Sequence, residues 1–254
     1  MKLRTMGFNV RCADDANGHS VAERAPRLFS LIEEYDPAII CFQEVTPIWI
    51  KPLHQLDEKY DHVIFFRDTD FQEGAPVFWK KDRFDYVSCE QFWFNDTPDR
   101  PHIKGWGADH VRHCIRVTLK DKESGKLIHA HSCHFCYVSS AQPKSAELMI
   151  KKVKALGEGE IAICIADYNF APDSEADKVM KSYFREVRQE IAPESRQATL
   201  CGYQPVGDKP EWIIDHCFYS GAGIDATGYE VITKDFDGKY ASDHYGMIYD
   251  FDLK

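Results

Sequence analysis

Seven polar residues follow or interrupt apolar stretches of the sequence, at positions where their side chains could do chemistry: Asn9, Glu44, Asp167, Asn169, Asp215, Asp243 and His244. Carboxylate and amide oxygens are ligands suited to Mg²⁺ or Mn²⁺, and Mg²⁺ usually takes only one or two carboxylates and keeps waters for a substrate phosphate. A carboxylate such as Asp215 can also hold the imidazole of His244 in one tautomer. Together these residue types outline a site for hydrolysis of a phosphate ester.

Each residue also has an ordinary structural interpretation. Asp167 and Asn169 are common in turns that leave a strand, so an Asx turn explains them locally. Glu44 follows five apolar residues and fits a surface turn, because an unpaired buried carboxylate is costly. Asn9 fits a strand end that caps the next loop. The functional interpretation therefore depends on whether the rest of the chain brings these residues together.

The apolar run at 161–166 predicts a strand buried on both faces, preceded by a turn at Gly157 and Gly159 and ended before Pro172. On an extended segment Asp167 and Asn169 would point the same way. They would project from the end of a core strand, where open α/β sheets place ligands. The run at 38–42 repeats the pattern: it follows a helix expected over 20–35 and ends at Glu44.

The remaining elements suggest two sheets with helices outside. Alternation predicts strands at 2–11, 62–66, 75–80, 84–94, 111–120, 127–135, 212–218, 224–232 and 245–253. Helical spacing predicts helices at 47–60, 144–156 and 175–188, with a loop at 196–209. Alternating helices and strands at both ends of the chain, with antiparallel strands between, favour an α/β fold with two sheets.

Composition narrows the class of protein. The 254 residues contain no repeat or low-complexity linker, which favours one domain over 1–254. A net charge of −10 disfavours broad binding to a polyanion, so long nucleic acid is not the favoured partner. No signal peptide or membrane span is recognisable, so a cytoplasmic protein is expected. The odd count of nine cysteines, several in apolar runs, indicates reduced thiols.

Six segments, taken in order, resemble the endonuclease/exonuclease/phosphatase superfamily, a bacterial branch in particular. They are Phe-Asn-Val-Arg at 8–11, Phe-Gln-Glu-Val at 42–45, Ser-Cys-His-Phe at 132–135, Ala-Asp-Tyr-Asn at 166–169, Ile-Asp-His-Cys-Phe at 214–218 and Ser-Asp-His at 242–244. Gly105 and Trp106 with Arg112 resemble a further stretch of the bacterial members. Each motif alone is weakly specific, but their shared order over nearly the whole chain is strongly so.

The resemblance implies a DNase I-like fold, a four-layer αββα sandwich with two mixed sheets face to face. It also implies a Mg²⁺- or Mn²⁺-dependent phosphoesterase in which Glu44 and Asn9 hold the metal. Asp243 would support the metal or the water, and Asp167 would align the attacking water. Residues given a role at the phosphate by the resemblance are Asn169, His134, Arg112 and His244, the last oriented by Asp215.

Several positions depart from the family pattern: Gly7 stands for Thr or Ser, Ala166 for Gly, Gly107 for Asp, Cys136 for Asp and Lys144 for Arg. The reactive residues of the motifs are kept. The departures therefore bear on the substrate more than on catalysis. A small phosphate ester, such as a sugar phosphate or nucleotide, is the first expectation, and a nuclease or DNA/RNA-end phosphodiesterase is the alternative.

Three competing interpretations remain. The crowded strand with His129, His131, Cys133, His134 and Cys136 raises a zinc site, although Cys133 and Cys136 would point to opposite faces of a strand. The aromatic run at 92–94 fits a base-stacking platform or, more commonly, core. A non-catalytic binding module on the same fold is the third. A monomer that acts on a phosphate ester is expected.

Overall fold

The computed structural model describes residues 1–254 as two six-stranded sheets. The first sheet contains, in spatial order, β11 (Ile224–Ile232), β12 (Gly246–Leu253), β1 (Lys2–Asn9), β2 (Ile39–Gln43), β4 (Val77–Lys80) and β3 (Tyr60–Val63). β1 and β2 run parallel, and the other neighbours in this sheet run antiparallel. The sheet is therefore mixed.

The second sheet contains, in order, β5 (Phe84–Trp93), β6 (His113–Asp121), β7 (Leu127–His134), β8 (Ile161–Asp167), β10 (Asp215–Ser220) and β9 (Arg185–Glu186). Its parallel pair is β7 and β8. Each sheet thus has one parallel pair near its centre, and in both pairs the strands end at the same edge.

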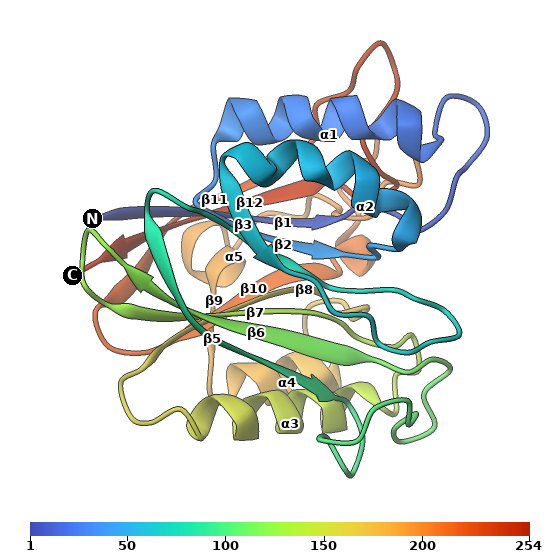
Figure 1. Ribbon diagram of the computed structural model, residues 1–254. Helices are drawn as coiled ribbons and strands as arrows, with labels where there is room; N and C mark the ends of the chain where they lie inside the picture. The colour runs from blue at the N-terminus through green and yellow to red at the C-terminus, as the bar shows by residue number, and fades with distance from the viewer.

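Helices cover the outer faces of the sheets (Figure 1). α1 (Val21–Tyr35) and α2 (Pro47–Leu53) pack on the first sheet, while α3 (Gln142–Lys154) and α4 (Glu175–Lys181) pack on the second. The short α5 (Val187–Ile191) packs against β10 and β11. This arrangement confirms the predicted four-layer αββα sandwich. None of the helices combines the length and apolar character needed to cross a membrane.

The side-chain period of two explains how the layers form. In β8, Ile161, Ile163 and Ile165 belong to the core between the two sheets. The alternate residues Ala162, Cys164 and Ala166 belong to the core beneath α3 and α4. A strand with one apolar face for each neighbouring layer is buried throughout, which accounts for the uninterrupted apolar run.

Most predicted elements differ from the observed ones by one or two residues at their ends, and four differ more. The helix expected at 47–60 is α-helical only to Leu53 and continues as a 3₁₀ turn at His54–Glu58. The strand expected at 62–66 is β3, shifted to Tyr60–Val63. The helix expected at 175–188 ends at Lys181, because Phe184 turns into the core and β9 then pairs with β10. The strand expected at 212–218 begins only at Asp215, since Pro210–Trp212 forms a 3₁₀ turn.

Candidate active site

The strand ends meet at the seam between the two sheets. Asn9, His134 and Asp167 are the last residues of β1, β7 and β8, and Asp215 is the first residue of the antiparallel β10. Each lies an even number of residues from a strand residue that faces the opposite sheet, such as Leu3, Ala130 or Ile165, and so lies on the same face of its strand. Their side chains therefore project into one space at a single edge of the sandwich.

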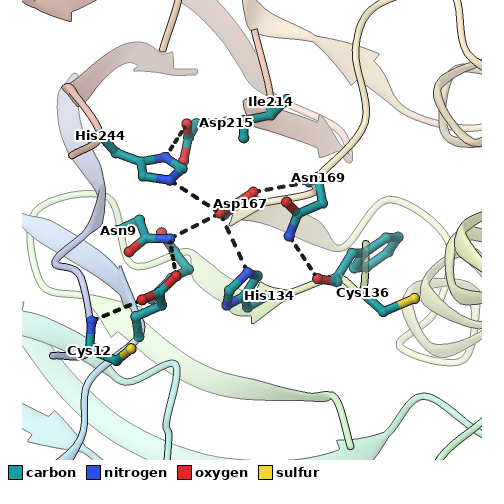
Figure 2. Close-up of polar contacts among 12 residues, drawn as sticks. Asn9, Cys12, His134, Cys136, Asp167, Asn169, Ile214, Asp215 and His244 are labelled. Carbon is teal, nitrogen blue, oxygen red and sulfur yellow. Dashed lines mark hydrogen bonds and ion pairs between the residues drawn. The ribbon is translucent and has the colours of Figure 1, made fainter. Parts of the chain in front are cut away.

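Asp167 lies at the centre of this space (Figure 2). Its Oδ2 accepts a hydrogen bond from Nδ2 of Asn9 at 2.9 Å. The same oxygen is 3.5 Å from Nε2 of His134 and 3.7 Å from Nε2 of His244. Two imidazoles that approach from different sheets thus converge on one carboxylate oxygen.

Glu44 lies directly after β2, with its backbone in the left-handed region at φ 61°. This conformation is uncommon for a residue other than glycine and is often found at functional sites. The carboxylate of Glu44 accepts hydrogen bonds from Nδ2 of Asn9 at 3.1 Å and from the backbone N–H of Cys12 at 2.9 Å. Asn9 therefore links the carboxylates of Glu44 and Asp167.

A carboxylate lies behind each histidine. Nδ1 of His244 is 2.9 Å from Oδ2 of Asp215, and Nδ1 of His134 is 3.1 Å from Oε1 of Glu73. A carboxylate at Nδ1 keeps the proton there and fixes the ring, so that Nε2 faces the site. The site thus contains two histidine–carboxylate pairs, one on each side of Asp167.

Glu73, which binds His134 in the candidate site, was not predicted from the sequence. It lies in the loop before β4 and is 6% exposed, yet it binds Arg67 at 2.9 Å and Arg112 at 3.0 Å besides His134. The only signal in the sequence is an acid directly before Gly74, just ahead of an apolar strand. Arg112 and His134 are 39 and 61 positions away in the chain, so the sequence does not reveal these contacts.

Charge and burial shift the pKa of the central groups. Burial raises the pKa of the Asp167 carboxyl, although His134 opposes the shift. Burial alone would lower the pKa of His244, but Asp215 and then Asp167 outweigh it and raise that pKa well above its ordinary value. Asp167 is therefore a better proton acceptor than a free carboxylate, and its neighbours favour the protonated form of His244.

The two glutamates show the opposite shift. Burial would raise the pKa of Glu73, but the hydrogen bond and charge of His134, with the two arginines, lower it to about 2. Burial likewise opposes ionisation of Glu44, yet His134 and Asn9 lower its pKa overall. Both glutamates are thus held as carboxylates in the buried site.

Thr199, in the segment expected to be a loop at 196–209, helps to position Asp215 and His244. Oγ1 of Thr199 accepts hydrogen bonds from the backbone N–H groups of Ile214 and Asp215 at 3.0 and 3.1 Å. Its carbonyl accepts from the backbone N–H of Tyr245 at 2.7 Å. One buried threonine therefore ties the start of β10 to the chain next to His244.

Three predicted site residues lie differently from expectation. The prediction that Asn169 extends the strand is wrong: its φ is 53°, and its Nδ2 donates to the carbonyl of Phe135 at 2.9 Å. Asp243 is not among the converging ligand atoms; its Oδ1 accepts from Ser242 and its Oδ2 is 3.8 Å from Nε of Arg11. Arg112 is 3% exposed and bound to Glu73 behind His134. The roles of these residues in binding phosphate or metal stay predictions.

The donor set fits a divalent cation. Ligand atoms of Glu44, His134 and Asp167 lie within 4.8 Å of one another, and so do those of Asp167, Asp215 and His244. Buried carboxylate oxygens so close together repel one another unless a cation or proton lies between them. Both groups contain two carboxylates, but only in the one with Glu44 does the carboxamide of Asn9 contact both of them. Carboxylates with an adjacent amide suit Mg²⁺ or Mn²⁺.

The alternative interpretations find less support. The crowded residues of β7 form no group of three ligand atoms apart from the one that His134 joins. Cys133 is packed in the core beneath the helices. Phe92 and Phe94 belong to the same core, and Nε1 of Trp93 donates to the carbonyl of Arg67. The aromatic run is therefore core rather than a stacking platform.

Comparison with known proteins identifies related folds. The sequence profile of the Endonuclease/Exonuclease/phosphatase family matches residues 6–244. No curated protein sequence gives a significant match. A crystal structure of an endonuclease/exonuclease/phosphatase from Bacteroides vulgatus superposes with a TM-score of 0.91 at 24% identity and covers 100% of both chains.

Two other solved structures carry more specific descriptions. A mannosyl-6-phosphatase from Bacteroides thetaiotaomicron has a TM-score of 0.88 and 24% identity over 98% of this chain and 99% of its own. D. rerio TDP2, complexed with a single-strand DNA product, has a TM-score of 0.80 and 20% identity over 99% of each chain. At these identities, all below 25%, the structural likeness shows a shared fold and no more.

Proposed function

Because the chain belongs to the endonuclease/exonuclease/phosphatase family, we propose that it is a Mg²⁺- or Mn²⁺-dependent phosphoesterase that hydrolyses a small phosphate ester by attack of water. The observation that carries the proposal is the convergence on Asp167 of two histidines, each paired with a carboxylate. Such pairs present N–H donors where negative charge develops on a phosphoryl group.

In this proposal Glu44 and Asn9 hold the cation, which when bound would stabilise negative charge on the phosphate and the leaving group. Asp167 orients a water molecule and accepts its proton, for which its raised pKa is suited. His134 and His244, when each ring carries both protons, donate from Nε2 to the phosphoryl oxygens. Glu73 and Asp215 hold the two rings in that orientation.

The small substrate is favoured by charge. Nucleic-acid enzymes need a basic surface that follows the phosphate backbone. This chain has a net charge of −10, and the two arginines behind His134, Arg67 and Arg112, are buried against Glu73. A phosphatase of similar fold is consistent with this choice. A DNA- or RNA-end phosphodiesterase is the alternative, and the TDP2 structure with its single-strand DNA product is consistent with it.

The experiment is hydrolysis of p-nitrophenyl phosphate and bis-p-nitrophenyl phosphate with Mg²⁺, with Mn²⁺ and with EDTA. We expect metal-dependent release that falls at least about 100-fold in Asp167→Asn, the scale for loss of one essential group. Asp252→Asn, an exposed carboxylate paired with Lys2, is the matched control and should keep full activity.

The ester that is hydrolysed faster separates a monoesterase from a diesterase. Equal rates for wild type and Asp167→Asn would overturn the assignment of Asp167. No release of p-nitrophenol with either metal would contradict hydrolysis of generic esters and would favour the binding-module interpretation, which a calorimetric titration with Mn²⁺ would then examine.

A further inference from the structure

A polar hollow of about 450 Å³ adjoins the site on the side of the first sheet. Its lining includes Arg11, Asp15, His19, Tyr203, Lys239 and Asp243. The backbone N–H of Arg11 donates to Oδ1 of Asn9 at 3.0 Å, and Asp243 immediately precedes His244, so the hollow lies next to two residues of the site. We call it the loop hollow, because its walls come from three loops, at 11–19, 202–204 and around Lys239.

The walls of the loop hollow are held in place by internal contacts. Asp15 accepts hydrogen bonds from Nε of Arg11 at 2.9 Å and from the hydroxyl of Tyr203 at 2.8 Å. The ring of Tyr203 stacks on His19 with centroids 3.9 Å apart, and Nζ of Lys239 donates to the carbonyl of Asn17 at 2.8 Å. A preformed concave site with converging polar groups is typical of small-molecule binding.

The charges of the loop hollow cancel. Arg11 and Lys239 contribute two positive charges, and Asp15 and Asp243 contribute two negative ones. His19 adds none near neutral pH, because burial and then the charge of Lys239 lower its pKa below the ordinary value. A site for a second phosphate or a nucleic-acid backbone needs an excess of positive charge. The loop hollow therefore suits an uncharged group.

Two free carboxamides add hydrogen-bonding capacity. Asn17 and Gln204 line the loop hollow with exposed side chains, and only their backbone atoms take part in hydrogen bonds within the protein. A carboxamide both donates and accepts, as a hydroxyl group does. A lining of carboxamides, carboxylates and cations around one aromatic ring suits a ligand with several hydroxyl groups, and an apolar leaving group would find little apolar surface there.

We infer that the loop hollow binds the hydroxyl-bearing part of the substrate, so that the preferred substrate is the phosphate monoester of a sugar or related polyol. This inference rests on the proposed function, since it places the phosphate at Asp167 and the two histidines. Asn17 and Gln204 act as specificity-determining residues that bind hydroxyl groups of the substrate. They take no part in the chemical step.

The test compares glucose, mannose and galactose 6-phosphates with p-nitrophenyl phosphate and a 5′-phosphorylated oligonucleotide, all with Mn²⁺. For wild type we expect the highest kcat/KM with one of the hexose phosphates. For each protein we compare kcat/KM for that hexose phosphate with kcat/KM for p-nitrophenyl phosphate. In the double variant Asn17→Ala/Gln204→Ala, this ratio should fall about 10-fold or more, mainly because KM for the hexose phosphate rises. Gln189→Ala, an exposed glutamine on α5, is the matched control and should leave the ratio unchanged.

The outcomes separate the two proposals. If the aryl ester or the oligonucleotide is hydrolysed better than every hexose phosphate, or if the ratio is unaltered in the double variant, the loop hollow does not bind the sugar. If no ester is hydrolysed, the proposed function fails. Calorimetric binding of mannose 6-phosphate to Asp167→Asn protein, with and without the two alanines, then decides the inference: binding weakened by the alanines supports it, and unchanged or absent binding overturns it.

Discussion

At the scale of single residues, the site depends on groups that act in pairs. Asp167 contacts both histidines, but the orientation of each ring is set by a carboxylate behind it. Of these two carboxylates, Asp215 belongs to a strand that pairs with β8, so the sheet itself fixes its place opposite Asp167. Glu73 lies in a loop and is fixed instead by Arg67 and Arg112. The orientation of His244 therefore depends on strand pairing, whereas the orientation of His134 depends on buried ion pairs in a loop.

The Glu73→Gln variant examines the loop-held pair. The amide keeps the shape but removes the negative charge. Arg112 is then buried without a counter-ion, Arg67 keeps only Asp68 at 3.6 Å, and His134 is less firmly oriented. We expect kcat to fall about 10- to 100-fold, the range for loss of a group that orients another in such a site. We also expect a loss of stability of about 3–5 kcal/mol, as for a broken buried ion pair.

Steady-state kinetics with p-nitrophenyl phosphate and urea unfolding measure the two effects of Glu73→Gln. Glu194→Gln is the control, because this exposed glutamate lies outside the site. Unchanged kcat with reduced stability would show that Glu73 is needed only for folding. Reduced kcat with unchanged stability would show that the arginines find other partners.

At the scale of elements, the distance between the two sheets determines whether their ligands meet. Gly7 on β1 faces β8, and a Cβ atom added to it would be 2.5 Å from Cγ2 of Ile165. The side chain at this position points into the core between the sheets. The departure of Gly7 from the family pattern therefore concerns sheet packing and has no direct contact with the substrate. Ala166 similarly faces the helix layer.

A double-mutant cycle checks the contact between the sheets. Gly7→Ala should destabilise the protein by about 1–3 kcal/mol through overpacking. Ile165→Ala should cost about 2–5 kcal/mol through loss of buried apolar volume. Because Ile165→Ala removes the methyl group that the new Cβ would meet, the double variant should be more stable than the sum of the two losses implies, as urea unfolding would measure. Strict additivity would contradict this contact.

A second contact between secondary-structure elements joins β9 to β10 through the side chains of Glu186 and His216. Oε1 of Glu186 is 3.1 Å from Nδ1 of His216, whose Nε2 is 3.0 Å from the carbonyl of Phe170, near Asn169. Burial would raise the pKa of Glu186, but the hydrogen bond and charge of His216 lower it to about 2. Burial would lower the pKa of His216, but Glu186 raises it overall. The pair therefore anchors the loop after β8.

These shifts predict how the Glu186 pair depends on pH. A lowered carboxyl pKa stabilises the fold above the unfolded value near 4.5, and this contribution is lost as pH falls toward about 2. A raised histidine pKa stabilises the fold below about 6.5, and its contribution is lost as pH rises through the folded value. The stability difference between wild type and Glu186→Gln should thus be greatest between about pH 4.5 and 6.5, on the order of 3 kcal/mol.

Urea unfolding at pH 3.5, 5.5 and 7.5 measures this difference, with Glu194→Gln as the matched control. The difference should shrink at pH 3.5. A difference independent of pH would mean that the ionised pair contributes nothing beyond packing.

At the scale of the whole molecule, negative charge and a buried acidic site act together. The net charge of −10 attracts cations in general, but only the seam between the sheets brings three carboxylate and imidazole ligand atoms within 4.8 Å of one another. A cation bound there would interact with residues of both sheets. Binding to the folded state alone should therefore stabilise the whole sandwich.

Thermal unfolding with Mn²⁺ measures this stabilisation without any substrate. At a concentration 100 times the Kd, binding adds about 2.7 kcal/mol, which raises the Tm of a protein of this size by roughly 5–10 °C. EDTA should reverse the rise, and Glu44→Gln should reduce it strongly while Asp252→Asn keeps it. An equal rise in wild type and Glu44→Gln would show that Mn²⁺ binds elsewhere.

The sequence alone was sufficient for the fold class and for the order of the main strands. A buried strand that ends in a polar residue is a local pattern, so Asn9, Glu44 and Asp167 could be recognised without tertiary contacts. The motif order then led to the αββα sandwich, which the structure confirms. Element ends were less accurate, as at 175–188, because the break there depends on where Phe184 packs.

The tertiary structure decided which groups act on one another. Glu73 and His134 are 61 positions apart, and the hydrogen bond between them depends on how one sheet lies on the other. The loop hollow likewise exists only because loops from distant parts of the chain meet beside Asp243. The sequence determines which way a strand residue alternates, since the period of two is a property of the backbone. Which face of a strand contributes to the site is decided only by the position of the second sheet, which packs against that face.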